Sequence, residues 1–173
     1  MKSILLSVVT VLALAHLAQA EDVTVKISDV HLCCQKCVKG VATAVQGIDG
    51  IKAVADKDTE EVVITGPDKA TVQKAADALV KAGYFGTCSD PGIKIDSSTG
   101  AKGVKVQTLK VVDAHVCCPK CVKAINHALS EVPGVVTNTA TKEVSYFTVT
   151  GDFNDADVFA ALQKIGLTGK EGQ

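Results

Sequence analysis

The chain contains no arginine and no tryptophan, and aromatic residues make up only 3% of its 173 residues. All 18 basic residues are therefore lysines. Arginine is the side chain best suited to bidentate recognition of phosphates and bases, so its absence argues against nucleic-acid recognition. The net charge of −1 supplies no strong basic field that would attract nucleic acid or an anionic membrane. We therefore expect no nucleic-acid partner.

Motifs for hydrolytic or group-transfer chemistry are also missing from the sequence. It has no His-Glu-x-x-His, no phosphate-binding glycine loop and no Gly-x-Ser-x-Gly turn. The acidic residues next to the cysteine clusters, Asp29 and Asp113, are not arranged as an acid–base pair. The sequence predicts a protein that is not an enzyme.

The first twenty residues have the pattern of a signal peptide. Lys2 precedes an apolar run from Ile4 to Ala15, and small residues follow at Ala18 and Ala20. The apolar run is short for a membrane span, so we predict cleavage after Ala20 over a retained anchor, and no membrane association afterwards. The mature protein is then exported, periplasmic in a Gram-negative-type bacterium and secreted otherwise.

The rest of the chain is a tandem duplication. The segment HLCCQKCVKGVATAVQGIDG (31–50) matches HVCCPKCVKAINHALSEVPG (115–134) at a constant offset of 84. We predict one unit over 21–89 and a second over 104–173. The segment between them, 90–103, is rich in glycine, serine and aspartate, and is expected to be a flexible linker.

Each unit has the hydrophobic periodicity of alternating strands and helices. In the first unit the order is strand 23–30, a helix from Cys34, strands 51–58 and 61–66, helix 69–83 and a last strand at 84–89. The second unit repeats this order with strands at 104–114, 135–141 and 143–150, and its closing segment 167–173 is polar and expected to be poorly ordered. The βαββαβ order predicts an α+β fold of two tandem ferredoxin-like sandwiches.

Six of the seven cysteines lie in two Cys-Cys-x-Lys-Cys clusters, Cys33, Cys34 and Cys37 in the first unit and Cys117, Cys118 and Cys121 in the second. Disulfides are the usual state of cysteines after export. The odd count and the adjacent cysteines weaken that interpretation, because neighbouring cysteines pair only with backbone strain.

Each cluster contains a Cys-x-x-Cys pair at the start of a predicted helix, where free N–H groups and the helix dipole favour thiolates. Lys36 and Lys120 add favourable charge. Thiolates are the metal-binding form, and two soft sulfur ligands favour Cu(I), with Zn(II), Hg(II) or another thiophilic ion behind it.

Both units resemble heavy-metal-associated domains, which occur in copper chaperones, mercury-scavenging periplasmic proteins and the N-terminal tails of metal-pumping ATPases. The resemblance covers most of 23–89 and 105–169 and implies a Met-x-Cys-x-x-Cys metal motif. On that basis the metal ligands are Cys34 and Cys37 in one unit and Cys118 and Cys121 in the other. The resemblance also implies that the protein exchanges metal with a metal-transporting membrane ATPase or another metalloprotein.

The motif departs from the family pattern in both units. Leu32 and Val116 stand at the methionine position, and His31 and His115 stand at the preceding glycine position. The extra cysteines, Cys33 and Cys117, also occur in many plant-type members of the family.

The loop before the last strand lies near the metal in this family. Here GYFG (83–86) matches its Gly-Tyr pattern and places Tyr84 near the site, whereas GLTG (166–169) lacks the aromatic residue.

The roles of the extra side chains stay open at this point. Cys33 and Cys117 are either additional thiolate ligands or half-buried small residues at a strand end. His31 and His115 are either ligands or polar residues that end a strand. Cys88 has no counterpart in the second unit and is expected to be a buried thiol, and His127 is expected to face solvent.

Two other functions compete with a metal carrier or buffer. One is a thiol–disulfide redox protein that uses the same Cys-x-x-Cys pairs. The absence of tryptophan and the small size of each unit argue against a thioredoxin-like domain. The other is a binding module for an exported or membrane partner in which the metal is a structural clamp.

Overall fold

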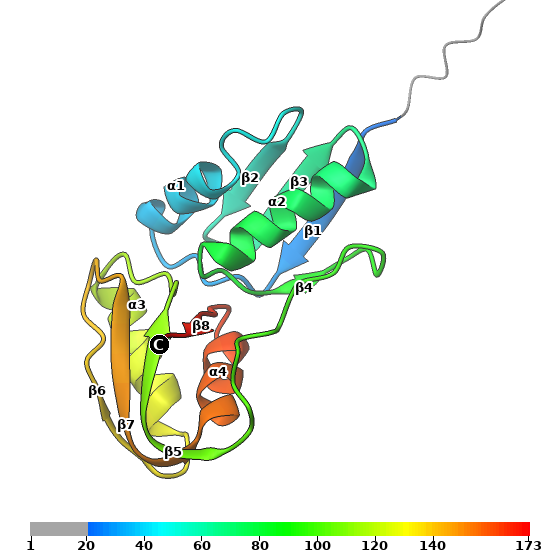
Figure 1. Cartoon of the computed structure of the whole chain (residues 1–173). Helices are drawn as coiled ribbons and strands as arrows, with labels where there is room; N and C mark the ends of the chain where they lie inside the picture. Colours follow the sequence, from blue (N-terminus) through cyan, green and yellow to red (C-terminus); the bar gives the residue numbers. More distant parts are fainter. Residues whose placement is uncertain (1–20) are drawn as a thin grey trace, which may run out of the picture.

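A computed structural model describes residues 21–173 of the chain, and the predicted signal peptide 1–20 lies outside the described residues. Two α/β units follow one another along the chain and meet at one end (Figure 1). No helix within residues 21–173 has both the length and the apolar character needed to cross a membrane.

The first unit has the predicted βαββαβ order. Its elements are β1 (Val23–Ser28), α1 (Gln35–Ala44), β2 (Lys52–Asp56), β3 (Glu61–Gly66), α2 (Lys69–Lys81) and β4 (Thr87–Cys88). The four strands form one antiparallel sheet in the order β2-β3-β1-β4. This is the ferredoxin-like topology, so the predicted fold class is confirmed for this unit.

The second unit repeats the topology. Its elements are β5 (Lys105–Val112), α3 (Pro119–Ser130), β6 (Val135–Asn138), β7 (Tyr146–Asn154), α4 (Asp155–Lys164) and β8 (Lys170–Glu171). Its sheet has the order β6-β7-β5-β8, again with antiparallel pairs. The predicted fold class is confirmed here too.

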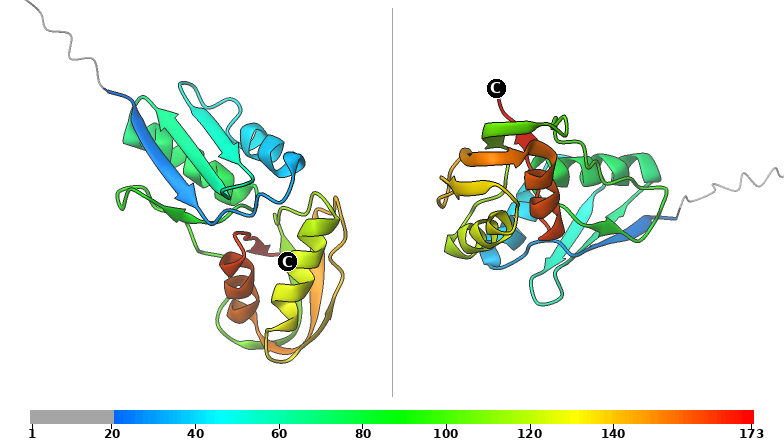
Figure 2. Two further views of the ribbon diagram at one scale, coloured as in Figure 1. Left: turned by 180° about the vertical axis from the view of Figure 1, so that it is seen from behind. Right: turned by 90° about the horizontal axis from the view of Figure 1, so that it is seen from below.

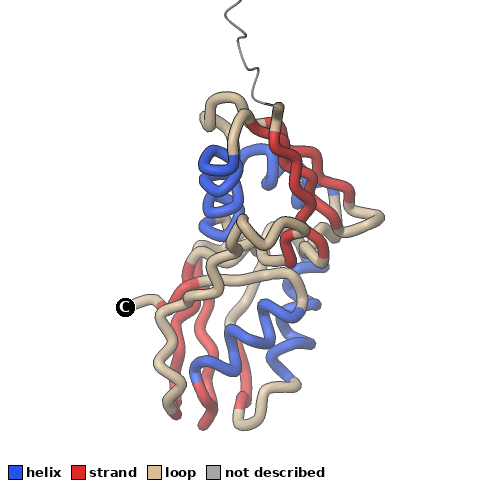
Figure 3. The backbone as a smooth tube through the Cα atoms, turned by 90° about the vertical axis from the view of Figure 1, so that its right-hand side faces the viewer, coloured by secondary structure: helices blue, strands red, loops and turns tan. Residues whose placement is uncertain are grey.

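In each unit the two helices cover one face of the sheet (Figures 2 and 3). The period-2 pattern explains which face: along β3, Val62 and Ile64 are fully buried while their neighbours are half-exposed. α2 packs on this face through Val72 and Leu79. Burying side chains of this size stabilises the fold by about 1.5–3 kcal/mol each.

The last strand of each unit is shorter than the sequence predicts. β4 and β8 have two residues each, and both pair with the first strand of their own sheet. The C-terminal segment, which was expected to be poorly ordered, therefore has a defined pairing. The residues just before these strands form a contact between the two units.

The segment 90–103 makes hydrogen bonds to both units. The backbone N–H of Lys94 donates to the Gln73 side chain of α2, which donates back to the Lys94 carbonyl. The buried Asp155 carboxylate accepts the backbone N–H groups of Lys102 and Val104 at 2.9 Å each. The division of the chain at this segment stays a prediction, and these bonds define its path over the two units.

Candidate metal centre

The two units meet through equivalent loops, 83–85 and 166–168. The Thr168 N–H donates to the Gly83 carbonyl at 3.0 Å, and the Phe85 N–H donates to the Gly166 carbonyl at 3.1 Å. Tyr84 and Leu167 lie opposite one another as an antiparallel bridge. The same loop of each unit therefore contacts its counterpart, as in the interface of a symmetric dimer.

Glycine is required in both loops. Gly83 has φ +85°, and a Cβ there would lie 2.3 Å from the backbone nitrogen of His115. Gly166 has φ +75°, and a Cβ there would lie 2.4 Å from the backbone nitrogen of His31. The loop of each unit thus lies directly against the cysteine-bearing loop of the other unit.

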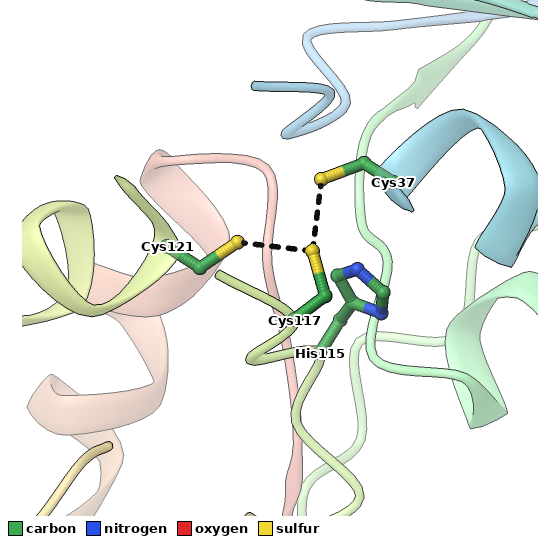
Figure 4. A group of neighbouring side chains, drawn as sticks. All are labelled: Cys37, His115, Cys117 and Cys121. Atoms are coloured by element: carbon green, nitrogen blue, oxygen red, sulfur yellow. Dashed lines mark hydrogen bonds between the residues drawn. The ribbon is translucent and has the colours of Figure 1, made fainter. Parts of the chain in front are cut away.

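The N-terminal ends of α1 and α3 carry the Cys-x-x-Cys pairs into this interface. Cys34 and Cys118 are the N-cap residues of the two helices. Cys37 and Cys121 lie in the first turns and are fully buried. Figure 4 shows Cys37 and Cys121 approaching Cys117 from the two helices.

All six clustered thiols form one group. Four Sγ–Sγ contacts cross between the units: Cys33–Cys118 and Cys33–Cys121 at 3.6 Å, Cys37–Cys117 at 3.5 Å and Cys34–Cys117 at 3.8 Å. Four further contacts lie within the units, each at 3.7 Å. The sequence assigns one Cys-x-x-Cys pair to each unit, and the structure brings both pairs into a single cluster.

The sulfur spacing suits a bound metal ion. With metal–sulfur bonds of about 2.3 Å, two ligands of a tetrahedral site lie about 3.8 Å apart, and two ligands of a linear site lie about 4.6 Å apart. In a flat three-coordinate site the separation is about 4.0 Å. The observed distances of 3.5–3.8 Å are therefore closest to the tetrahedral value, next to the three-coordinate value, and well below the linear value. Such a group of sulfur donors is suited to a soft ion.

His115 is tied to Tyr84. The Tyr84 hydroxyl donates to the Cys37 carbonyl at 2.8 Å and lies 3.2 Å from Nε2 of His115, and the two rings stack at 4.5 Å. Because the single hydroxyl proton is used on Cys37, Nε2 of His115 must be the donor in their contact. A ring nitrogen of His115 lies within 4.8 Å of the sulfurs of Cys37, Cys117 and Cys121, but while Nε2 donates to Tyr84 it has no free lone pair for a metal.

His31 is in the opposite situation. Its Nε2 is buried and has no hydrogen-bond partner. The loop beside it, which begins at Gly166, has Leu167 where the equivalent loop has Tyr84. A ring nitrogen of His31 lies within 4.8 Å of the sulfurs of Cys33 and Cys121. An unpartnered buried nitrogen beside two thiols fits a metal ligand.

Protons are held unequally within the cluster. Partial burial raises the pKa of the Cys34 thiol, but backbone N–H groups in the first turn of α1 outweigh it and bring the pKa to about 7. The contact between Cys37 and Cys121 raises the pKa of Cys37 and lowers that of Cys121. Burial raises the pKa of Cys33 and Cys117. Several thiolates at one place need a cation, so metal binding and proton release are coupled.

The remaining residues of interest lie around or away from the cluster. Lys36 forms an exposed ion pair with Glu143 of the other unit at 2.7 Å, and Lys120 is exposed in the first turn of α3. Cys88 is a half-buried free thiol on β4, outside the cluster. His127 is exposed and lies 3.8 Å from Glu131.

Sequence reasoning did not identify two residues of the site. Gly40 on α1 leaves room for Tyr84, since a Cβ there would lie 2.2 Å from the tyrosine hydroxyl. Glu143 reaches the site only because the units dock. The one signal available was the duplication itself, in which Gly40 aligns with Ala124 and Tyr84 with Leu167.

Comparisons with known proteins leave the family open. No protein-family model matches the chain. One similar solved structure is that of the N-terminal soluble domains of Bacillus subtilis CopA, with 16% identity over 88% of this chain and 95% of that chain, and a TM-score of 0.34. Another is that of the first two RRM domains of the yeast poly(U)-binding protein Pub1, with 12% identity, 86% and 97% coverage, and a TM-score of 0.27. At these TM-scores neither likeness identifies a family, so the chemistry of the thiol cluster is the guide to function.

Proposed function

We propose that this protein is an exported, non-enzymatic carrier or buffer of soft metal ions, with Cu(I) as its preferred ion. The observation that carries the proposal is the meeting of six thiols from two Cys-Cys-x-Lys-Cys motifs, with Sγ–Sγ distances of 3.5–3.8 Å. Sulfur-only coordination favours Cu(I), and it also accepts Zn(II), Hg(II) and other thiophilic ions. His31 adds one nitrogen donor at the edge of the cluster.

The exposure of the thiols supports a role in metal transfer. Cys37 and Cys121 are fully buried, whereas Cys34 and Cys118 are half-exposed at the rim of the cluster. An incoming thiolate from a partner has access to the rim sulfurs before the buried ones release the ion. Handover by ligand exchange follows from this arrangement.

The exported location and the partner are further parts of the proposal. The signal-peptide pattern of residues 1–20 supports export. A metal-transporting membrane ATPase or another exported metalloprotein is the partner class implied by the resemblance to heavy-metal-associated domains. The absence of hydrolytic and transfer motifs supports a role without catalysis.

The test is an anaerobic titration of the reduced protein, residues 21–173, with Cu(I) against a competing chelator. We expect about two tightly bound ions per chain, and the loss of about one ion in each of the variants C34S/C37S and C118S/C121S. A variant with serine at all six clustered cysteines is the matched control and should bind none tightly. Weak binding by the reduced wild type, equal to that of the control, would reject the metal function.

One observation favours a second function, thiol–disulfide exchange. The pKa of about 7 for the Cys34 thiol at the start of α1 gives a nucleophilic thiolate near neutral pH. This function predicts reductase activity on a model disulfide and easily cycled Cys34–Cys37 and Cys118–Cys121 disulfides. Those results, together with weak Cu(I) binding, would replace the metal carrier with a redox protein.

A further inference from the structure

Building on the proposed function, we propose that Cys33 and Cys117 are exchanged ligands: each completes a three-sulfur metal site with the Cys-x-x-Cys pair of the opposite unit. The first site is then Cys34, Cys37 and Cys117, and the second is Cys118, Cys121 and Cys33. The ions expected at both sites are soft and thiophilic, such as Cu(I). This assignment gives the extra cysteine of each motif a defined role.

The first line of support is the pattern of sulfur contacts. Cys117 lies 3.8 Å from Cys34 and 3.5 Å from Cys37, which are 3.7 Å from each other. These three sulfurs form a closed triangle whose edges suit three ligands on one ion.

The second triangle consists of the Cys-x-x-Cys pair of the second unit and the extra cysteine of the first unit. Cys33 lies 3.6 Å from both Cys118 and Cys121, which are 3.7 Å from each other. Two triangles with exchanged corners follow from the reciprocal contact of the loops.

The cysteines of one unit form a less complete set. Within residues 21–173, the contacts Cys33–Cys37 and Cys34–Cys37 join the three thiols of the first unit, both through Cys37. In the second unit both contacts pass through Cys121 in the same way. The sulfurs of Cys33 and Cys34 lie within 4.8 Å of one another but make no direct contact, so a three-sulfur site inside the first unit would have to shorten that distance.

The extended backbone at the second cysteine of each pair fits the lack of a direct contact between adjacent sulfurs, although those of Cys33 and Cys34 lie within 4.8 Å of one another. Cys34 has φ −163° and ψ 170°, and Cys118 has φ −155° and ψ 168°, both fully extended. Successive side chains of an extended chain point to opposite sides. Cys34 stays with its helix, and Cys33 is directed across the interface towards the other unit.

Each exchanged site needs both units. A bound ion replaces one proton on each thiol that ligates it, and those protons pass to solvent. Neither unit contains all three ligands of a site, so metal binding and the docking of the two units stabilise one another.

The test uses two backgrounds of the reduced protein, residues 21–173, with Cu(I) alone as the probe. In C118S/C121S only the first Cys-x-x-Cys pair remains, and either C117S or C33S is added to it. We expect C117S to weaken Cu(I) binding about tenfold or more and C33S to change it less than about twofold. X-ray absorption should count three sulfurs around Cu(I) in the background and with C33S, and two with C117S.

The second background reverses the roles and serves as the internal control. In C34S/C37S, we expect C33S to weaken binding and C117S to have little effect. If each extra cysteine instead affects only the pair of its own unit, or if both have equal effects, the exchange is wrong while the metal function stands. Loss of Cu(I) binding by the wild type would reject the proposed function itself. Circular dichroism of each variant checks the fold, and the sulfur count decides the assignment for every variant that is folded.

Discussion

The two halves of the metal centre have equivalent thiols but different surroundings. In the first half, built on Cys34 and Cys37, Tyr84 fills the space over α1, donates to the Cys37 carbonyl and holds His115. In the second half, built on Cys118 and Cys121, Leu167 stands at the tyrosine position.

The helix in each half differs in the same way as the loop residue that packs on it. Gly40 on α1 admits the tyrosine hydroxyl, and Ala124 stands at the equivalent position of α3. The histidine of the first half is fixed by hydrogen bonding, whereas Nε2 of His31 in the second half has no partner. Histidines at equivalent positions of the two duplicated sites therefore differ in whether Nε2 is free to bind a metal, because one surrounding residue differs.

The largest loss of stability should come from substitutions in the equivalent loops 83–85 and 166–168. Gly83→Ala and Gly166→Ala each place a Cβ against the backbone of the other unit at positive φ. We expect each to lower the free energy of unfolding by about 2–4 kcal/mol, measured by urea denaturation. Gly47→Ala is the control, because Gly47 also has positive φ (+89°) but nothing within 4 Å of a new Cβ. Clearly unequal effects of the two loop variants would contradict a reciprocal interface.

The tyrosine of the first half should have the next largest effect. Tyr84→Phe leaves the Cys37 carbonyl and His115 Nε2 without this partner, and we expect a loss of about 1–2 kcal/mol in the free energy of unfolding. Gly40→Ala should destabilise the wild type through its collision with the hydroxyl. In the Tyr84→Phe background, the same change should cost clearly less, because the collision at 2.2 Å is gone and only the close approach to Cε1 of His115 at 3.0 Å remains. Equal effects of Gly40→Ala in both backgrounds would show that the tyrosine hydroxyl is not the reason for glycine at this position.

The histidines should separate binding from stability. His31→Phe removes the unpartnered nitrogen, so we expect Cu(I) binding at the second half to weaken about tenfold, with little change in the stability of the metal-free protein. His115→Phe should instead lower stability, because Tyr84 loses its contact. Chelator competition and urea denaturation measure the two effects. Equal loss of Cu(I) affinity in both variants would show that the halves use their histidines alike.

A smaller effect should appear as pH is lowered. Burial lowers the pKa of His115 below its ordinary value of 6.5; Cys121 opposes this and His31 adds to it. The unfolded chain therefore binds this proton more readily, so the contribution of His115 to stability is complete above pH 6.5 and is lost as pH falls through its folded-state pKa. Denaturation of the metal-free, reduced protein should show this loss, and His115→Phe should reduce it. The variant His127→Phe is the control, because His127 is exposed and lies away from the cluster, and it should keep the pH-dependent loss.

The smallest effect should come from the rim. Lys36 and Glu143 join the two units by an ion pair whose side chains are both more than half exposed. Solvent screens such pairs, so Lys36→Ala should lower the free energy of unfolding only slightly, and the difference should shrink in high salt. Lys120→Ala is the matched control from the other half. A loss several times larger than this would show that the pair carries the docking of the units.

The fold followed from the sequence because its signals are local. Alternation of apolar residues over 23–30, the short apolar segment 61–66 after a tight turn, and helical spacing over 69–83 predicted elements that the structure contains as β1, β3 and α2. The boundaries were less accurate at the ends. The strand expected at 84–89 is two residues long because 83–85 contacts the other unit.

The thiols were recognisable from their spacing, but their grouping was not. The distance between Cys33 and Cys121 depends on how the units dock, and docking depends on Gly83 and Gly166, which the sequence shows only as ordinary glycines before a last strand. Likewise, His115 is held by Tyr84 of the opposite unit, whereas the equivalent loop next to His31 has Leu167 at the tyrosine position. Patterns within one unit carry no information on such contacts.

The path of the segment 90–103 has a consequence for how the centre assembles. Because this segment joins the two units covalently, the meeting of their thiols is an intramolecular event, with an effective concentration of about millimolar for a short linker. Dilution of the protein therefore leaves the cluster intact. At a given concentration of free metal, the occupancy of the centre is then independent of the protein concentration.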